Sequence, residues 1–305
     1  MAKDGLTLAD ALEMHLRAMR AKACSRRSVD TLREECARHL GDWLARPLAS
    51  IARNECAVRH EELTERSGPY VANRVLQQFR AIYNTAARRF EELPATNPVV
   101  AVTFNRVRRR REPIAWDELP AWRRRVDALA NPVRRELQLF LLFTGLRSLD
   151  ARTVRWEHVD LGAGTVHRPR PKGGEDRAFT VPLARAVLAL LEPRARPSGW
   201  VFSARDRAGR ETHVVEAKEQ RIVGGRKVRW LPSPHRLRDT FASAAHEARV
   251  HPLDLKVLMN HALPAADDVT QGYIRPSIEH LRGCVEAVAG FLEERMGSER
   301  TGGSI

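Results

Sequence analysis

The chain is 305 residues long and carries 52 lysines and arginines against 38 acidic residues. The net charge of +14 and the isoelectric point near 10.6 predict a salt-sensitive attraction for polyanions, of which nucleic acid is the simplest. We expect a cytosolic protein, because there is no apolar run of membrane-spanning length and no signal-peptide pattern at the start. Four cysteines without CxxC spacing and eleven histidines without an HExxH pair argue against a disulfide framework and a metal centre.

The first ninety residues are predicted to be helical. From Val71 onward, apolar residues recur at steps of three and four, which is the period of an amphipathic helix. Arg74 and Arg80 fall largely off this apolar stripe. They could line a solvated helix face, but in so basic a chain a DNA-facing surface is at least as good an interpretation.

A cationic segment follows, running from Phe104 to Pro113 and containing four consecutive arginines: Arg108, Arg109, Arg110 and Arg111. Blocks of like charge resist folding and make good tethers along phosphates. We predict a linker that lies along DNA, and a merely solvated loop is the alternative.

The next elements alternate between helix and short strands. Residues 136–144 form a strongly apolar helix that Gly145 should end, so that Arg147 is presented at the turn. Residues 156–183 are predicted to be short strands and turns with repeated glycines, and Lys172 lies among them. Ser233 and Pro234 then make a good helix start. His235 and Arg238, three apart, should share one face of the first turn, where the helix N-terminus also favours a phosphate.

These cations, together with His261 and Tyr273, match what attack on a phosphodiester needs. A phenol with a pKa of about 10 must lose its proton to attack phosphorus, and the anionic transition state needs a cationic clamp. Two arginines suit that clamp because a guanidinium presents forked donors to two oxygens. A lysine or an imidazole can protonate the leaving oxygen.

In order and in surrounding sequence, these motifs resemble those of the tyrosine recombinases, the phage integrase family. The Thr-Gly-Leu-Arg147 box has an acidic residue three positions on, at Asp150, and Lys172 precedes a strand-like Phe-Thr-Val. His235-Arg-Leu-Arg238 is followed by Asp-Thr-Phe. In the segment Leu-Met-Asn260-His261, Asn stands where the family usually has Gly before the histidine. Tyr273, in Gly-Tyr273-Ile, lies twelve residues beyond His261.

The resemblance implies a role for each of these residues. Tyr273 would attack the scissile phosphate to form a 3′-phosphotyrosyl intermediate without ATP. Arg147, Arg238 and His261 would stabilise the transition state. Lys172 would act as general acid, His235 would assist proton transfer, and Asp150 would orient the group from behind. No cofactor and no metal is expected.

The expected fold is mainly α with a small antiparallel β-sheet. A helical, SAM-like core-type DNA-binding domain (1–103) precedes a basic linker (104–112), a mixed α/β catalytic domain (113–296) and a disordered tail (297–305). The amphipathic helix of residues 277–295 could pack in its own domain or dock into a neighbouring subunit. Because the helical pattern starts near residue 6, arm-site binding is in doubt.

The predicted function is a site-specific DNA recombinase or integrase of bacterial or phage origin that acts in the cytoplasm, associated with the nucleoid. Its partners would be double-stranded recombination sites, further copies in a tetramer on synapsed DNA, and accessory DNA-bending or excision factors. One alternative is a catalytically inactive DNA-binding regulator. A type IB topoisomerase is disfavoured, because such enzymes usually have Lys-x-x-Arg where this chain has His235-x-x-Arg238.

Overall fold

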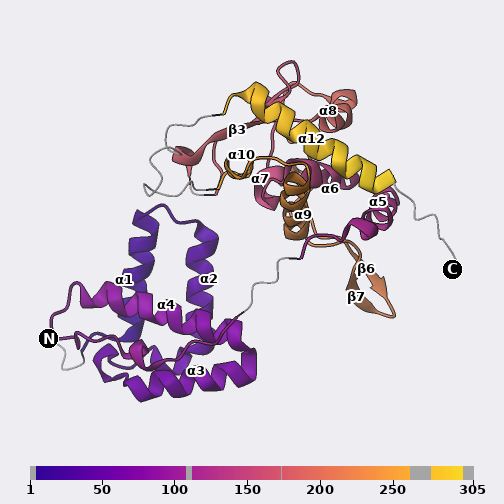
Figure 1. Cartoon of the computed structure of the whole chain (residues 1–305). Coiled ribbons are helices and arrows are strands. Elements are labelled where there is room, and N and C mark those ends of the chain that lie inside the picture. Colours follow the sequence, from indigo (N-terminus) through magenta and orange to yellow (C-terminus); the bar gives the residue numbers. More distant parts are fainter. Residues whose placement is uncertain (1–4, 108–111, 173, 262–275, 298–305) are drawn as a thin grey trace. The chain divides into compact units, whose positions relative to one another are not determined.

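The computed structural model describes residues 5–107, 112–172, 174–261 and 276–297. The chain divides into two compact units, residues 1–109 and 110–305, each with its own hydrophobic core (Figure 1). Within the described residues, no helix is both long and apolar enough to cross a membrane.

The first unit is helical, as the sequence predicts. Thr7 caps the first helix in a reciprocal box with Asp10, which satisfies backbone donors at the helix start. Phe104 and Asn105, at the start of the predicted linker, pack against this unit, and the backbone N–H of Asn105 donates to Asn73 Oδ1 at 2.9 Å. The helices are α1 (Leu8–Ala21), α2 (Arg26–His39), α3 (Arg53–Ser67) and α4 (Pro69–Ala87), with 3₁₀ turns η1 (Gly41–Trp43), η2 (Leu48–Ser50) and η3 (Pro98–Ala101).

The second unit combines helices with short antiparallel strands. Its helices are α5 (Leu119–Asp127), α6 (Pro132–Thr144), α7 (Ser148–Arg152), α8 (Arg185–Leu191), α9 (Pro234–Glu247), α10 (Pro252–Leu258) and α12 (Ile278–Gly297). Its 3₁₀ turns are η4 (Trp116–Glu118), η5 (Trp156–His158), η6 (Glu175–Arg177) and η7 (Glu192–Arg194).

In the described part of the chain, the strands form three separate small sheets rather than one. The first has the order β1-β2-β3, and the other two are hairpins, β4-β5 and β6-β7. In the first sheet Val166 pairs with Val181, and both are buried against the core, so this sheet is fixed to the helices. The strands are β1 (Val159–Asp160), β2 (Thr165–Arg168), β3 (Phe179–Pro182), β4 (Ser203–Arg205), β5 (Glu211–His213), β6 (Gln220–Val223) and β7 (Arg226–Arg229).

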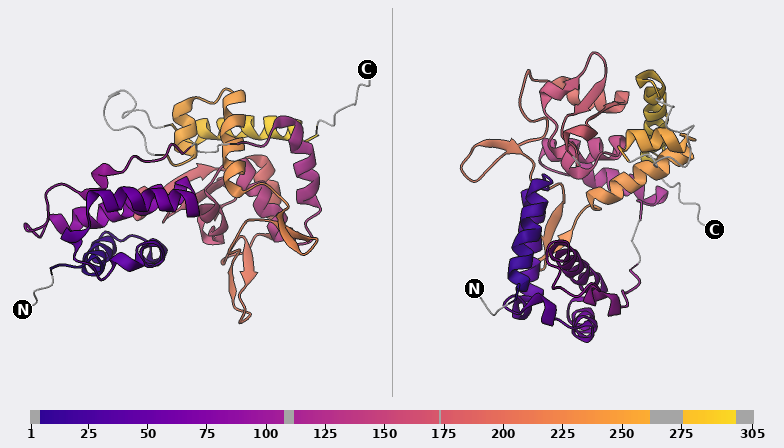
Figure 2. Two further views of the ribbon diagram at one scale, coloured as in Figure 1. Left: turned by 90° about the horizontal axis from the view of Figure 1, so that it is seen from below. Right: turned by 90° about the vertical axis from the view of Figure 1, so that its left-hand side faces the viewer.

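The C-terminal helix α12 packs within its own unit. Leu281, Val285, Val288 and Leu292 lie on one face and are all buried in the second core. The helix contacts α5, α6 and α9, and Figures 1 and 2 show it in yellow along the second unit. Of the two positions predicted for this helix, the structure therefore has the intramolecular one.

Candidate active site

The turn after α6 presents Arg147 as the sequence predicts. Gly145 ends the helix in the left-handed conformation, with φ of 59° and ψ of 12°. A Cβ at this position would overlap the ring of Phe241, a fully buried residue of α9. Glycine is thus required for both backbone geometry and packing, and α6 is held against the helix that carries Arg238.

Arg238 is a deeply buried cation of the candidate site, with only 5% of its surface exposed. Its Nη1 donates to the Gly145 carbonyl, and its Nη2 lies 2.8 Å from the Met259 carbonyl and 2.7 Å from His261 Nε2. Burial, and secondarily the nearby Arg147, lowers the pKa of the Arg238 guanidinium to about 10. The side chain therefore stays charged at neutral pH, in a fixed orientation.

The turn after α10 brings His261 to the two arginines. Both terminal nitrogens of Arg147 donate to the Asn260 carbonyl at 3.3 Å. Because a guanidinium can only donate, His261 Nε2 must accept from Arg238, which places the imidazole proton on Nδ1. Asn260 has a φ of 45°, and its side-chain Nδ2 donates to the Arg177 carbonyl at 3.2 Å, in the segment between β2 and β3.

Asp150 lies behind this cluster and is 3% exposed. Burial raises the pKa of its carboxyl group, while the charges of Arg168, Arg147 and Arg238 and a backbone hydrogen bond from Lys172 oppose that rise. Asp150 thus has three arginines around it, and it connects the backbone at Lys172 to the arginine cluster.

Lys172 itself has an exposed side chain in the connection from β2 to β3. His235 is also exposed, with 71% of its side chain accessible, and its Nε2 lies 3.9 Å from Asp239 Oδ2. Ser233 precedes the helix as predicted, but its side chain makes no capping hydrogen bond. Lys172 and His235 are therefore accessible to a ligand, whereas Arg238 and Asp150 form the buried base.

The remaining predicted site residues do not join this cluster in the described part of the chain. Tyr273 and the four arginines of the predicted linker, Arg108 to Arg111, lie outside the described residues. Arg74 Nε donates to Glu35 at 2.8 Å, so part of its charge is compensated within the first unit. Arg80, on the same helix, is exposed.

Two features were missed by sequence reasoning. The first is Arg168, which is 4% exposed and donates to the Thr153 carbonyl at 2.8 Å. Strand alternation could have shown this, since Arg168 shares a face with the buried Val166.

The second missed feature is the β6-β7 hairpin, which stands out from the second unit in Figure 1. Every residue of both strands is exposed. The turn is Gly224-Gly225, both with positive φ, a signal for a tight hairpin that the sequence contains. Ile222 is 72% exposed, and the cations of the hairpin are Arg221, Arg226, Lys227 and Arg229.

Taken together, the described side chains make a cationic centre suited to an anion such as a phosphate. The chain belongs to the phage integrase family, since the family's sequence pattern matches residues 126–280, a little over half of its length.

Two curated relatives illustrate the family. Over 206 residues the chain is 26% identical to prophage integrase IntZ of Escherichia coli (strain K12), which covers 65% of this chain and 50% of that protein. Over 181 residues it is 28% identical to tyrosine recombinase XerA of Thermococcus kodakarensis, which covers 57% of this chain and 62% of the relative. The matches thus span about half to three-fifths of the length of these relatives.

Solved structures share the fold. The Tn1549 transposon integrase, in complex with a circular intermediate DNA, superposes with a TM-score of 0.62 at 13% identity, over 90% of this chain and 97% of that one. A lambda integrase tetramer bound to a Holliday junction gives a TM-score of 0.63 at 15% identity, over 87% and 80% of the two chains. The predicted mainly α class with antiparallel strands is confirmed, although the described strands form three small sheets where one was predicted.

Proposed function

We propose that this protein is a tyrosine-type site-specific DNA recombinase that integrates or excises a phage or another mobile element. The observation that carries the proposal is the meeting of Arg147, Arg238 and His261 at the turn after α10, with Asp150 buried behind them. Family membership and the names of the relatives support the same activity.

In the proposed reaction, the phenolic oxygen of Tyr273 attacks the scissile phosphorus and forms the 3′-phosphotyrosyl bond. The bond from phosphorus to the 5′-oxygen breaks, and that oxygen leaves as a hydroxyl after taking a proton from Lys172. His235 assists removal of the phenol proton. Attack by a 5′-hydroxyl on the phosphotyrosine reverses these steps and rejoins a strand, so no high-energy nucleotide is consumed.

The arginine cluster would stabilise the phosphorane-like transition state. Arg238 is held by two carbonyls and by His261, so its orientation is set before the substrate arrives. Pre-oriented donors cost no reorganisation at the moment of reaction, and removal of one such donor typically slows catalysis about 10²–10³-fold. We therefore assign Arg238 and Arg147 as the clamp, with Asp150 as a positioning residue.

Double-stranded DNA is the proposed partner, and a homotetramer on two synapsed sites is the proposed assembly. The lambda integrase structure, described as a tetramer on a Holliday junction, supports that assembly. In this proposal, residues 1–103 are a core-type DNA-binding domain, 104–112 a basic linker and 113–296 the catalytic domain. Action on DNA in the cytoplasm, with accessory bending factors, belongs to the same proposal.

The β6-β7 hairpin is proposed as a further DNA contact. Its strands carry four cations and no acidic residue, and a two-stranded ribbon fits the major groove. The guanidinium of Arg221 stacks on Trp230, 3.4 Å from the ring centroid, which holds the base of the hairpin. The cations nearer the turn, Arg226 and Lys227, are then free to reach phosphates.

The decisive experiment is detection of a covalent protein–DNA adduct on denaturing gels, with nicked duplexes that span the junctions of the element encoding the chain. Wild type should form the adduct, and Tyr273→Phe should bind the DNA without forming one. Arg238→Lys should bind but form the adduct roughly 10²-fold more slowly, because lysine cannot make the forked contacts. DNA binding without an adduct in wild type would favour the inactive regulator.

The hairpin is tested by the salt dependence of DNA binding. The DNA-binding constant falls as salt rises, and each lost phosphate contact should make the plot of its logarithm against log salt less steep by about 0.9. Arg226→Ser/Lys227→Ser should therefore flatten the slope by nearly two, while adduct formation at saturating protein is retained. The matched control is Arg124→Ser/Arg295→Ser, which removes two exposed cations from α5 and α12. Equal slopes for the two double variants would refute the hairpin contact.

A further inference from the structure

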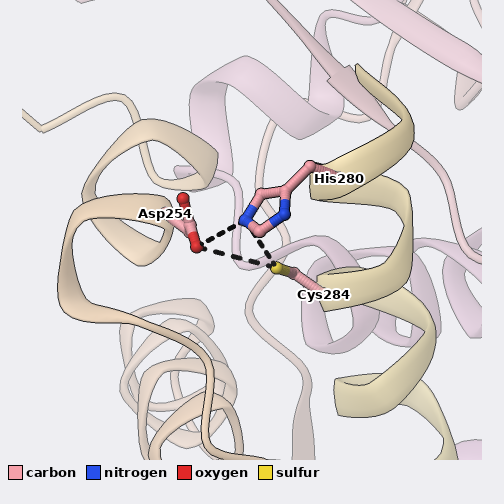
Figure 3. Close-up of side chains that lie close together, drawn as sticks. All are labelled: Asp254, His280 and Cys284. Atoms are coloured by element: carbon pink, nitrogen blue, oxygen red, sulfur yellow. Dashed lines mark hydrogen bonds and ion pairs between the residues drawn. The ribbon is translucent and has the colours of Figure 1, made fainter. Parts of the chain in front are cut away.

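A second cluster of polar side chains lies between α10 and α12, away from the arginines. Asp254 belongs to the first turn of α10, while His280 and Cys284 are four residues apart on α12 and so point to the same side of that helix. Figure 3 shows the three side chains converging from the two helices.

The donor atoms are close enough to share one ion. His280 Nε2 lies 2.8 Å from Asp254 Oδ2, and Cys284 Sγ lies 3.9 Å from Asp254 Oδ2 and 4.0 Å from His280 Nε2. In a tetrahedral zinc site with metal–ligand bonds of about 2.0–2.3 Å, donors are roughly 3.3–3.6 Å apart. Each pair would have to move by only about half an ångström, which small side-chain rotations provide.

We propose that Asp254, His280 and Cys284 form a zinc-binding site that cross-links α10 to α12. A thiolate, an imidazole and a carboxylate are the ligand types that zinc takes, whereas magnesium and calcium prefer all-oxygen sites. The fourth position would be filled by water, because 57% of the His280 side chain is exposed and solvent reaches the cluster.

The environment of the donors fits a site that gains stability from a cation. The Asp254 side chain is only 8% exposed, so its charge is costly without a partner. The Cys284 sulfur lies beside both other donors. Zinc binding would displace the thiol proton to solvent and would replace the hydrogen bond between His280 and Asp254 with two metal bonds.

The sequence was expected to hold no metal because it lacks CxxC spacing and an HExxH pair. This cluster joins residues 26 positions apart through the packing of two helices. In the sequence, α10 ends shortly before His261 and α12 begins shortly after Tyr273. The zinc would therefore fix the two helices that flank the segment with these proposed catalytic residues.

The test is a cobalt(II) titration of the full chain after treatment with a chelator, followed by absorbance. One equivalent of cobalt should give a thiolate-to-cobalt charge-transfer band and tetrahedral d–d bands. Cys284→Ser should lose the charge-transfer band. The matched control is Cys24→Ser, which removes an exposed cysteine of the first unit and should leave the band unchanged.

A second measurement does not depend on the cobalt absorbance bands. Zinc should raise the thermal unfolding midpoint of wild type and Cys24→Ser, and this rise should be absent in Cys284→Ser and Asp254→Asn, with folding of each variant checked by circular dichroism. If wild type gives no thiolate band, or Cys284→Ser keeps it, the cluster is only a hydrogen-bonded ion pair and the proposal fails. Neither readout depends on recombinase activity.

Discussion

Replacement of Gly145 by alanine should disturb the fold and the candidate active site together. An L-residue in the left-handed conformation costs about 1–2 kcal/mol. The added methyl group also overlaps the buried ring of Phe241, and such overpacking costs about 1–3 kcal/mol. Alanine lowers the entropy of the unfolded chain, which offsets about 0.4–1 kcal/mol. The free energy of unfolding of the second unit should therefore fall by about 1–4.5 kcal/mol.

The assay is denaturant unfolding followed by tryptophan fluorescence, since all tryptophans except Trp43 lie in the second unit. Gly290→Ala, in α12, is the matched control, because nothing lies within 4 Å of an added Cβ there. A helical Gly→Ala change of this kind should stabilise by about 0.5–1 kcal/mol. Adding Phe241→Leu to Gly145→Ala should recover part of the loss, because the smaller side chain makes room for the methyl group.

Gly145→Ala should also slow adduct formation, since the Gly145 carbonyl is one of the groups that orient Arg238. A Gly145→Ala variant as stable as wild type, with unchanged adduct formation, would refute the account of this turn.

Three further outcomes are expected. Burial raises the pKa of the Cys36 and Cys56 thiols to about 12. The stability that these protonated thiols contribute should therefore be complete below pH 9 and should fall as the pH rises from 9 to 12. Unfolding of the first unit at several pH values, followed by Trp43, would show this fall, and a flat profile would contradict it. Burial also raises the pKa of Asp150, so wild type should lose stability relative to Asp150→Asn as the pH rises from acid to neutral. The variant should also form the adduct more slowly. A difference in unfolding free energy between wild type and variant that stays the same at every pH would contradict the buried position of Asp150. Leu292→Ala should destabilise the isolated monomer by about 2–5 kcal/mol, as measured by denaturant unfolding, because Leu292 is fully buried in its own unit; an effect on assembly alone would contradict the intramolecular packing of α12.

Much of the scaffold could be predicted from local sequence. The apolar run before Gly145 gives the end of α6, and the Ser233-Pro234 pair gives the start of α9. The period of apolar residues in α4 and α12 gives the faces that the structure buries. These signals are local, because helix ends and amphipathic faces depend on residues within a few turns.

The contacts that organise the candidate site could not be predicted in this way. The carbonyls of Gly145, Met259 and Asn260 orient the two arginines, and a backbone carbonyl leaves no trace in residue type. The burial of Arg168 depends on which face of β2 meets the core. Both depend on packing between elements far apart in the chain.

Asn260 shows what one departure from a common motif changes. Glycine would adopt a φ of 45° without strain, but only a longer side chain can donate to the Arg177 carbonyl. This hydrogen bond joins the turn that carries His261 to the segment that follows Lys172. A hydrogen bond worth about 0.5–1.5 kcal/mol shifts an equilibrium roughly 2- to 12-fold. Asn260 thus reduces the population of states in which the segment that follows Lys172 is detached from this turn, by the same factor.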